Sequence, residues 1–445
     1  MIIETSKCIQ NECDHECVDA CHSIHGEQAP LTVDSSSSVP AVEEDRCTEC
    51  LACLRACPLE AIHIDTPHIR PRRQRKSAKQ GNDSRVYETS PQLKQFPESD
   101  MIFARVHNDL TFENYGKWEF YGAEEAIARG TPGYSRFEHE LTRAAWEYYD
   151  KRNLVEEFSS NETPQARRFD NESQLTEMVK HAAKFFGADL VGVAEIDPRW
   201  IYSTDRQGNP FDISDSMRYG IVMALEMDYD AIATSPSFTS SAETGLGYSR
   251  MAFVETELSA FIRRLGYTAI PCGNDIALSV PLAIDAGLGQ YGRHGLLITR
   301  EYGPRVRLAK VLTDMQLVPD RYDIRFCEAV IRFCEICGKC AEMCPSQSIP
   351  HERERTWKGE TKSNNPGVKK WYVDVESCYD FWIQNGCDCS NCIRSCPFNK
   401  RNNWIHKAVT FIVERFPWLH KLVLAFDGLL GYGRQDSASR YWSQL

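Results

Sequence analysis

The chain has 445 residues, of which 42% are hydrophobic and 26% are charged, and its formal net charge is −12. A chain of this length predicts two or three domains, because single cores rarely grow beyond about 300 residues, and it holds no uninterrupted apolar stretch of about 18 residues that would predict a membrane-spanning helix. The negative charge argues against nucleic acid as a main partner, since phosphate groups are bound by positive surfaces.

Eight of the 19 cysteines lie in the first module, residues 1–65, which we predict to be a ferredoxin domain. Its segment CTECLACLRACP has the C-x2-C-x2-C-x3-C-P spacing of bacterial ferredoxins, in which the fourth cysteine binds the second of two cubane clusters. The segment CIQNECDHECVDAC has wider spacing and lacks the usual proline. Two [4Fe–4S] clusters are therefore predicted, with the ligand sets Cys8, Cys13, Cys17 and Cys57, and Cys47, Cys50, Cys53 and Cys21. A zinc site is the alternative.

Charge and composition change sharply after this module. Residues 1–65 hold three Lys or Arg against thirteen Asp or Glu, an acidity that suits either a basic redox partner or a solvated surface. Residues 66–95 are rich in Pro, Arg, Lys and Ser and poor in apolar side chains, which predicts a basic linker.

The first residues show neither a basic and apolar export signal nor a twin-arginine motif, so we expect a cytoplasmic location.

Helical and extended patterns alternate over residues 96–318. Helices are predicted at 136–151, 173–187, 250–266 and 275–287, and strands at 189–196, 219–229, 267–273, 294–299 and 305–314. This alternation predicts a mixed core of the α+β or α/β class. Residues 401–445 are predicted to form an amphipathic helical tail that packs back on the core, and a role of this tail at a membrane surface is left open.

A second cysteine-rich module occupies residues 319–400 and contains the segments FCEICGKCAEMCP and SCYDFWIQNGCDCSNCIRSCPF. If the fourth cysteine of each segment again binds the other cluster, one cluster lies on Cys334, Cys337, Cys340 and Cys396. The second then lies on Cys344, Cys389 and Cys392. Regular spacing would place the fourth ligand of the second cluster at Gly386. Either Cys378 or Cys387 must therefore complete it, and we favour Cys378 because Cys387 is very close in sequence to Cys389. Cys327 is predicted to be a buried thiol.

These two cysteine segments, including the detached Cys378, resemble the C-terminal iron–sulfur signature of the corrinoid-dependent reductive dehalogenases. The segments GLGYSRMA, IPCGNDIALSVPLAIDAGLGQYGRHGLLIT and GPRVRLAKVLTD resemble the core of that family. The resemblance implies a nitroreductase-like core that holds base-off cobalamin, and cleavage of the carbon–halogen bond of an organohalide. The first module resembles the ferredoxin module of the ribosome-recycling ABC ATPase, so four [4Fe–4S] clusters are expected in all, two N-terminal and two C-terminal.

The resemblance also implies the catalytic residues. The family's proton donor, a tyrosine in a Gly-Tyr-Ser context, corresponds to Tyr248. Its basic partner corresponds to Arg307, with Arg305 as the alternative, and a third pocket residue corresponds to Asn274. A cation beside the tyrosine is required because an ordinary phenol loses its proton only near a pH of about 10.

Three glycines, Gly287, Gly289 and Gly292, match the pattern G-x-G-x-x-G. A predicted helix precedes them and a strand follows, which is the reverse of the order in a dinucleotide-binding fingerprint. The resemblance implies instead that their backbone lies close to the corrinoid.

Other functions remain open at this point. One is an enzyme similar to epoxyqueuosine reductase, which shares the core but acts on tRNA and would need a basic surface. Another is a reductase of a substrate without halogen, and a third is a multi-cluster electron-transfer protein. For the main hypothesis, electrons are expected from a soluble low-potential donor such as a ferredoxin or flavodoxin reductase system, and a homodimer is left open.

Overall fold

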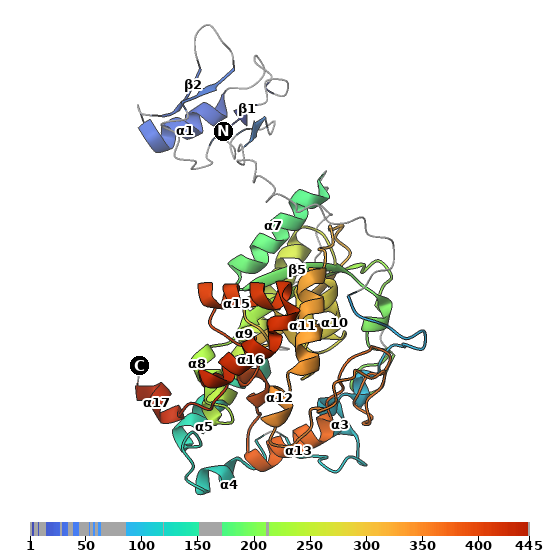
Figure 1. Cartoon of the computed structure of the whole chain (residues 1–445). Coiled ribbons are helices and arrows are strands. Elements are labelled where there is room, and N and C mark those ends of the chain that lie inside the picture. The colour runs from blue at the N-terminus through green and yellow to red at the C-terminus, as the bar shows by residue number, and fades with distance from the viewer. Residues whose placement is uncertain are drawn as a thin grey trace. The chain divides into compact units, whose positions relative to one another are not determined.

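The computed structural model describes residues 86–443 except 119, 151–170 and 211–212, and before them only the stretches 2–3, 8, 15–26, 29–33, 39–43, 53, 57 and 61–63. The chain divides into two units, Met1–Ser84 and Arg85–Leu445 (Figure 1). Cys13, Cys47, Cys50 and the arginines of the predicted linker lie outside the described residues.

The described part of the first unit contains one helix and two antiparallel strand pairs. These are α1 (Glu16–His25), β1 (Ile2–Ile3) with β4 (Ile62–His63), and β2 (Leu31–Thr32) with β3 (Ala41–Val42). Three predicted cluster ligands, Cys17, Cys21 and Cys53, are buried in the small core of this unit, and Cys57 packs against that core. The cysteines thus lie inside the unit, where a ferredoxin-like module needs them.

A four-stranded sheet forms the centre of the second unit. Its strands, in spatial order, are β5 (Leu190–Glu195), β6 (Tyr219–Glu226), β10 (Val306–Thr313) and β7 (Ala269–Cys272). Every neighbouring pair is antiparallel. The core therefore belongs to the α+β class, and the α/β alternative is wrong because adjacent strands run in opposite directions.

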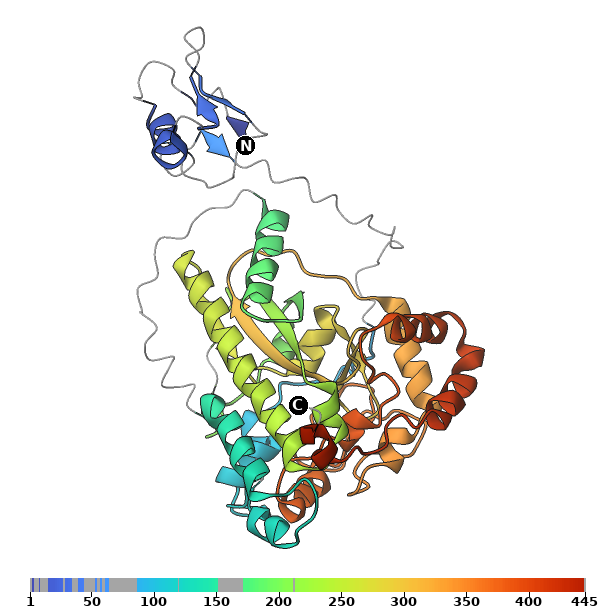
Figure 2. The same cartoon turned by 90° about the vertical axis from the view of Figure 1, so that its left-hand side faces the viewer.

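Helices cover both faces of this sheet, because its side chains alternate between the two faces. Ile221, Met223 and Leu225 of β6 are buried in the same core as residues of α7 (Glu172–Phe185) and α9 (Phe238–Arg264). Val222 is buried in a second core with residues of α10 (Ser279–Asp285). In Figure 2, α9 is the long yellow-green helix beside the sheet.

Helix α9 is longer than predicted, since it begins at Phe238 and not at Arg250. Ser237 and Ser240 form a capping box at its start, which satisfies two backbone donors at the helix terminus. The segment GLGYS lies within the helix, although glycine is a poor helix former. Burial on most sides of the helix outweighs that preference.

The remaining elements surround this core. They are η3 (Glu98–Asp100), α3 (Ile102–Asn108), α4 (Ala123–Ala128), α5 (Arg136–Asp150), η4 (Pro198–Trp200), α8 (Tyr229–Ala233), β8 (Gly289–Tyr291), β9 (Leu297–Thr299), α11 (Ile324–Ile336), α12 (Lys339–Glu342), α13 (Val375–Asn385), α14 (Asn391–Arg394), α15 (Trp404–Arg415), η5 (Pro417–Leu419), α16 (His420–Leu429) and α17 (Ala438–Ser443). Strand β9 pairs with β8 in a separate sheet. No helix in the described ranges is long and apolar enough to cross a membrane.

Two segments of the structure differ from the sequence-based prediction. Within the predicted linker, Tyr87 and Leu93 are buried in the second core, so residues 86–95 belong to the body of the second unit. The predicted tail helix is divided into α15 and α16 near Pro417, because proline cannot continue a helix. Both tail helices contact α11, which lies in the predicted second cysteine-rich module, whereas α17 contacts α8 of the predicted core.

Candidate active site

A cavity of about 450 Å³ lies within the second unit and has the size of a small-molecule site. Its walls include parts of α3, α5, α9, β10, α13 and α14. Buried polar atoms of six lining residues have no hydrogen-bond partner in the described structure, namely Trp146 Nε1, His294 Nε2, Arg307 Nε, Trp382 Nε1, Asp388 Oδ1 and Ser390 Oγ. Because buried polar atoms are nearly always paired, this group indicates a ligand with polar groups in the cavity.

The three residues expected at the catalytic centre come together beside this cavity. Asn274 Nδ2 donates a hydrogen bond of 2.8 Å to the hydroxyl oxygen of Tyr248. The guanidinium carbon of Arg307 lies 4.8 Å from the centre of the Tyr248 ring, a distance typical of a cation–π contact. Tyr248 and Arg307 both line the cavity. A phenol whose oxygen accepts a hydrogen bond and whose ring contacts a cation is suited to proton transfer.

The two glycines before Tyr248 make room for its neighbours. A Cβ atom on Gly245 would lie 2.5 Å from the Trp146 ring, and one on Gly247 would lie 2.9 Å from Arg307 Cγ. Trp146 stacks on the Tyr248 ring with the ring centres 4.9 Å apart. The motif GLGYS therefore lets an aromatic ring and an arginine pack against one turn of α9, on both sides of the tyrosine.

Lys310 contacts the turn that carries Asn274 and helps to hold it in place. Its side chain is fully buried, and its Nζ donates to the carbonyl of Gly273 and, at 2.8 Å, to Ser279 Oγ. Burial lowers the pKa of the Lys310 ammonium group. A buried cation is costly unless it is paired or hydrogen-bonded, so these contacts tie Lys310 closely to the turn.

A second contact holds the other side of this turn. Ile276 has a φ of 66°, a conformation that is rare for a β-branched residue. Its amide donates to the carboxylate of Glu98, which also accepts a bond of 2.8 Å from Arg206 Nε. Strained backbone persists only where its surroundings hold it in place, so Glu98 and Lys310 together keep Asn274 in position.

Replacing Lys310 with methionine should loosen this turn. Loss of a buried hydrogen bond to a carbonyl costs about 1–3 kcal/mol, so amide hydrogen exchange over residues 273–277 should become about tenfold faster. Mass spectrometry of peptides from this segment measures the change. Lys180→Met, which removes a 2.6 Å ion pair with Asp320 elsewhere in the unit, is the control. Unchanged exchange in Lys310→Met, or equal acceleration in the control, would contradict this role.

Arg305 is placed differently from Arg307. Its guanidinium group is buried, pairs with Glu226 at 2.7 Å and donates to Asn399 Oδ1 at 2.9 Å. It does not line the cavity. Arg305 immediately precedes the first residue of β10, whereas Arg307 lies within that strand. The geometry favours Arg307 as the partner of Tyr248.

Four cysteines also line this cavity: Cys344, Cys378, Cys389 and Cys392. Cys378 lies close enough to the other three to interact with them electrostatically. Burial raises the pKa of Cys392 to about 11 and that of Cys389 to about 12. Buried thiols of this kind become thiolates when a metal centre binds them, so this donor set fits an iron–sulfur cluster.

Cys387, the alternative fourth ligand, does not line the cavity. It is fully buried in a separate apolar cluster with Phe238 and Tyr134, and Asn385 Nδ2 donates to its sulfur at 3.3 Å. The geometry favours Cys378.

The other predicted ligand set also comes together. Cys340 interacts electrostatically with Cys334, Cys337 and Cys396, and its pKa is raised chiefly by burial. Among the described residues, however, no three His, Cys, Asp or Glu side chains converge as they would around a single metal ion. The predicted buried thiol Cys327 is confirmed, with 2% of its surface exposed.

Sequence reasoning missed Arg293, which supports this second set. The side chain is 2% exposed, and its Nε donates to the carbonyls of Cys334 and Cys337 at 3.2 and 3.0 Å. Its guanidinium carbon lies 4.8 Å from the centre of the Trp371 ring. The only sequence signal was an arginine in the glycine-rich segment GLGQYGRHG.

The three glycines expected beside the corrinoid contact protein atoms. A Cβ atom would meet the carbonyl of Arg321 at Gly287, the carbonyl of Ile298 at Gly289 and the His294 ring at Gly292. None of them lines the cavity, whereas Gly295 does. Packing within the protein accounts for these glycines, so a direct role in cofactor binding gains no support.

Two family models match the cysteine-rich segments. A 4Fe-4S dicluster domain matches residues 333–400, and a 4Fe-4S binding domain matches residues 40–63. Among curated proteins, a tetrachloroethene reductive dehalogenase of Desulfitobacterium hafniense is 40% identical over 311 residues, covering 60% of this chain and 55% of its own length. Over the matched part of its length, the chain is similar in sequence to the reductive dehalogenases.

Further comparisons agree with this relationship. The tetrachloroethene reductive dehalogenase of Sulfurospirillum multivorans is 38% identical over 299 residues, covering 60% of this chain and 59% of its own length. The chain thus spans little more than half the length of these two tetrachloroethene reductive dehalogenases. The solved structure of the catabolic reductive dehalogenase NpRdhA with 3-bromo-4-hydroxybenzoic acid has a TM-score of 0.63 at 21% identity, covering 79% of this chain and 49% of that chain. This likeness shows the same fold.

Proposed function

We propose that this protein is a reductive dehalogenase that replaces the halogen of an organohalide with hydrogen. The observation that carries the proposal is a single cavity that is lined both by Tyr248 and Arg307 and by Cys344, Cys378, Cys389 and Cys392. A proton donor and an electron-delivering centre thus face one ligand space. The reaction consumes two electrons and one proton, breaks the carbon–halogen bond, forms a carbon–hydrogen bond and releases halide.

The cavity fits a cofactor with polar groups, as its unpaired buried atoms indicate. A base-off cobalamin bound there would supply the low-potential metal centre that the chemistry requires. Tyr248 would donate the proton from its hydroxyl group. Arg307 would stabilise the phenolate that remains, and Asn274 would hold its oxygen through the 2.8 Å hydrogen bond.

Electrons would reach the cavity through the C-terminal clusters, which hold one electron at a time. The cluster on Cys344, Cys378, Cys389 and Cys392 would be the last carrier, because these residues line the cavity. We further propose two clusters in the first unit, a soluble low-potential donor and a cytoplasmic location. Aromatic rings in the lining, including Phe103, Trp146 and Trp382, favour a planar or apolar organohalide.

Anaerobic reconstitution with iron, sulfide and cobalamin tests this proposal. Four cubanes predict about sixteen iron atoms per chain, together with one cobalt atom and release of halide from chlorinated or brominated alkenes and phenols. Iron without cobalt would contradict the proposal and indicate an electron-transfer protein.

Cobalt without halide release would favour a different reductase. Sequence similarity supports one specific alternative, since an epoxyqueuosine reductase of Atelocyanobacterium thalassa is 31% identical over 120 residues, covering 26% of this chain. Assay with epoxyqueuosine-containing tRNA distinguishes the two activities.

A further inference from the structure

The segment 404–432, which comprises α15, η5, α16 and the following turn, exposes an unusual number of large apolar side chains. Those more than a third exposed are Trp404, Ile405, Phe411, Phe416, Trp418, Leu422, Phe426, Leu429, Leu430 and Tyr432. Leu422, Phe426, Leu429 and Leu430 follow the i, i+4, i+7, i+8 spacing of a helix face that normally packs against a partner. In Figure 2 these helices, drawn in red, lie at the periphery of the second unit.

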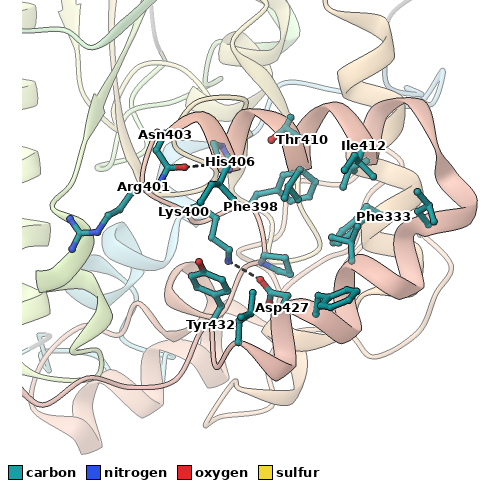
Figure 3. Close-up of a pocket in the computed structure, with 18 of the residues that line it drawn as sticks. Phe333, Phe398, Lys400, Arg401, Asn403, His406, Thr410, Ile412, Asp427 and Tyr432 are labelled. Atoms are coloured by element: carbon teal, nitrogen blue, oxygen red, sulfur yellow. Dashed lines mark hydrogen bonds and ion pairs between the residues drawn. The ribbon is translucent and has the colours of Figure 1, made fainter.

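A groove of about 470 Å³ opens between the two helices on this face (Figure 3). Ile405, Leu422, Phe426 and Leu430 line the groove and are also exposed. The polar groups at one end are already paired, because Lys400 Nζ lies 2.9 Å from an Asp427 carboxylate oxygen. The groove is therefore apolar and continuous with the exposed face.

The exposed charged side chains of this segment are all positive. It contains two carboxylates, and both are withdrawn from solvent in ion pairs, Glu414 with Arg300 and Asp427 with Lys339 and Lys400. Its three cations, Lys407, Arg415 and Lys421, are exposed. The surface thus presents apolar side chains and positive charge, without an exposed carboxylate of its own.

We propose that the α15–α16 face binds the surface of an anionic lipid bilayer. Paired amphipathic helices with Trp, Phe and Leu on one face and Lys or Arg beside it bind at the boundary between headgroups and acyl chains. Trp404 and Trp418, each 77% exposed, are residues that favour this boundary. A second copy of the chain fits less well, because a symmetric contact would bring the same cations together. The proposal is independent of the dehalogenase activity.

Co-sedimentation of the full chain, reconstituted with its clusters, with lipid vesicles tests this inference. The protein should bind vesicles made of equal parts phosphatidylcholine and phosphatidylglycerol, and bind much more weakly to phosphatidylcholine alone or at high salt. The combined variant Trp418→Ser, Leu422→Ser and Phe426→Ser should bind at least about tenfold more weakly, because burial of such side chains supplies the apolar attraction. Lys407→Gln with Lys421→Gln should also bind about tenfold more weakly.

The matched control carries Leu110→Ser and Phe185→Ser, which are 79% and 86% exposed outside this segment and should leave vesicle binding unchanged. Circular dichroism and thermal unfolding check that each variant is folded. Failure of the parent protein to bind anionic vesicles, or equal loss in the control, would overturn the proposal. So would a concentration-dependent dimer in analytical ultracentrifugation that the tail variants abolish while vesicle binding persists.

Discussion

Tyr248→Phe should lower the rate of halide release by about 10²- to 10⁴-fold, the usual contribution of a positioned proton donor, while bound iron and corrinoid stay at the parent level. The change removes only the hydroxyl group that accepts the 2.8 Å hydrogen bond from Asn274. The ring can remain between Trp146 and Arg307. Initial rates of halide release with an artificial one-electron donor, measured beside metal analysis of the same sample, give the result.

Tyr219→Phe provides the matched control for this experiment. Tyr219 packs against the same core as Tyr248 but does not line the cavity, so the loss of its hydroxyl should leave the rate close to that of the parent. A Tyr248→Phe protein that keeps most of its activity would exclude Tyr248 as the proton donor and direct attention to another group in the cavity.

Cys378→Ala should remove one C-terminal cluster, with a loss of about four iron atoms per chain and of nearly all halide release. Cys378 lies near Cys344, Cys389 and Cys392, and three thiolates hold a cubane less well than four. Iron and sulfide analysis with electron paramagnetic resonance of the reduced protein detects the missing cluster. Corrinoid content measured separately shows whether the cavity itself is intact.

Cys387→Ala distinguishes ligand loss from general damage to the fold. Cys387 is fully buried only a few residues from Cys389 and Cys392 but is packed against Phe238 and Tyr134, so its replacement should preserve the iron content at some cost in stability. If Cys387→Ala lost the cluster and Cys378→Ala kept it, the ligand assignment would be reversed.

Much of the fold could be read from local patterns. The helices predicted at 136–151 and 173–187 correspond to α5 and α7, and the predicted strands at 189–196 and 305–314 correspond to β5 and β10, because hydrophobic periodicity reports burial along one element. The full length of α9 and the pairing of β9 with β8 could not be read in this way. Both depend on contacts with residues distant in sequence.

Local sequence patterns were sufficient for two predictions: the spacing of the cysteines predicts iron–sulfur clusters, and the segments around Tyr248, Asn274 and Arg307 carry the resemblance to the reductive dehalogenases. Tertiary structure alone decided which of two cysteines lies beside the cavity, which of two arginines covers the tyrosine, and that a buried lysine and glutamate hold the Asn274 turn. The reason is physical: ligand spacing within a motif is a local property of the chain, whereas the groups that meet across a cavity are selected by the packing of segments far apart in sequence.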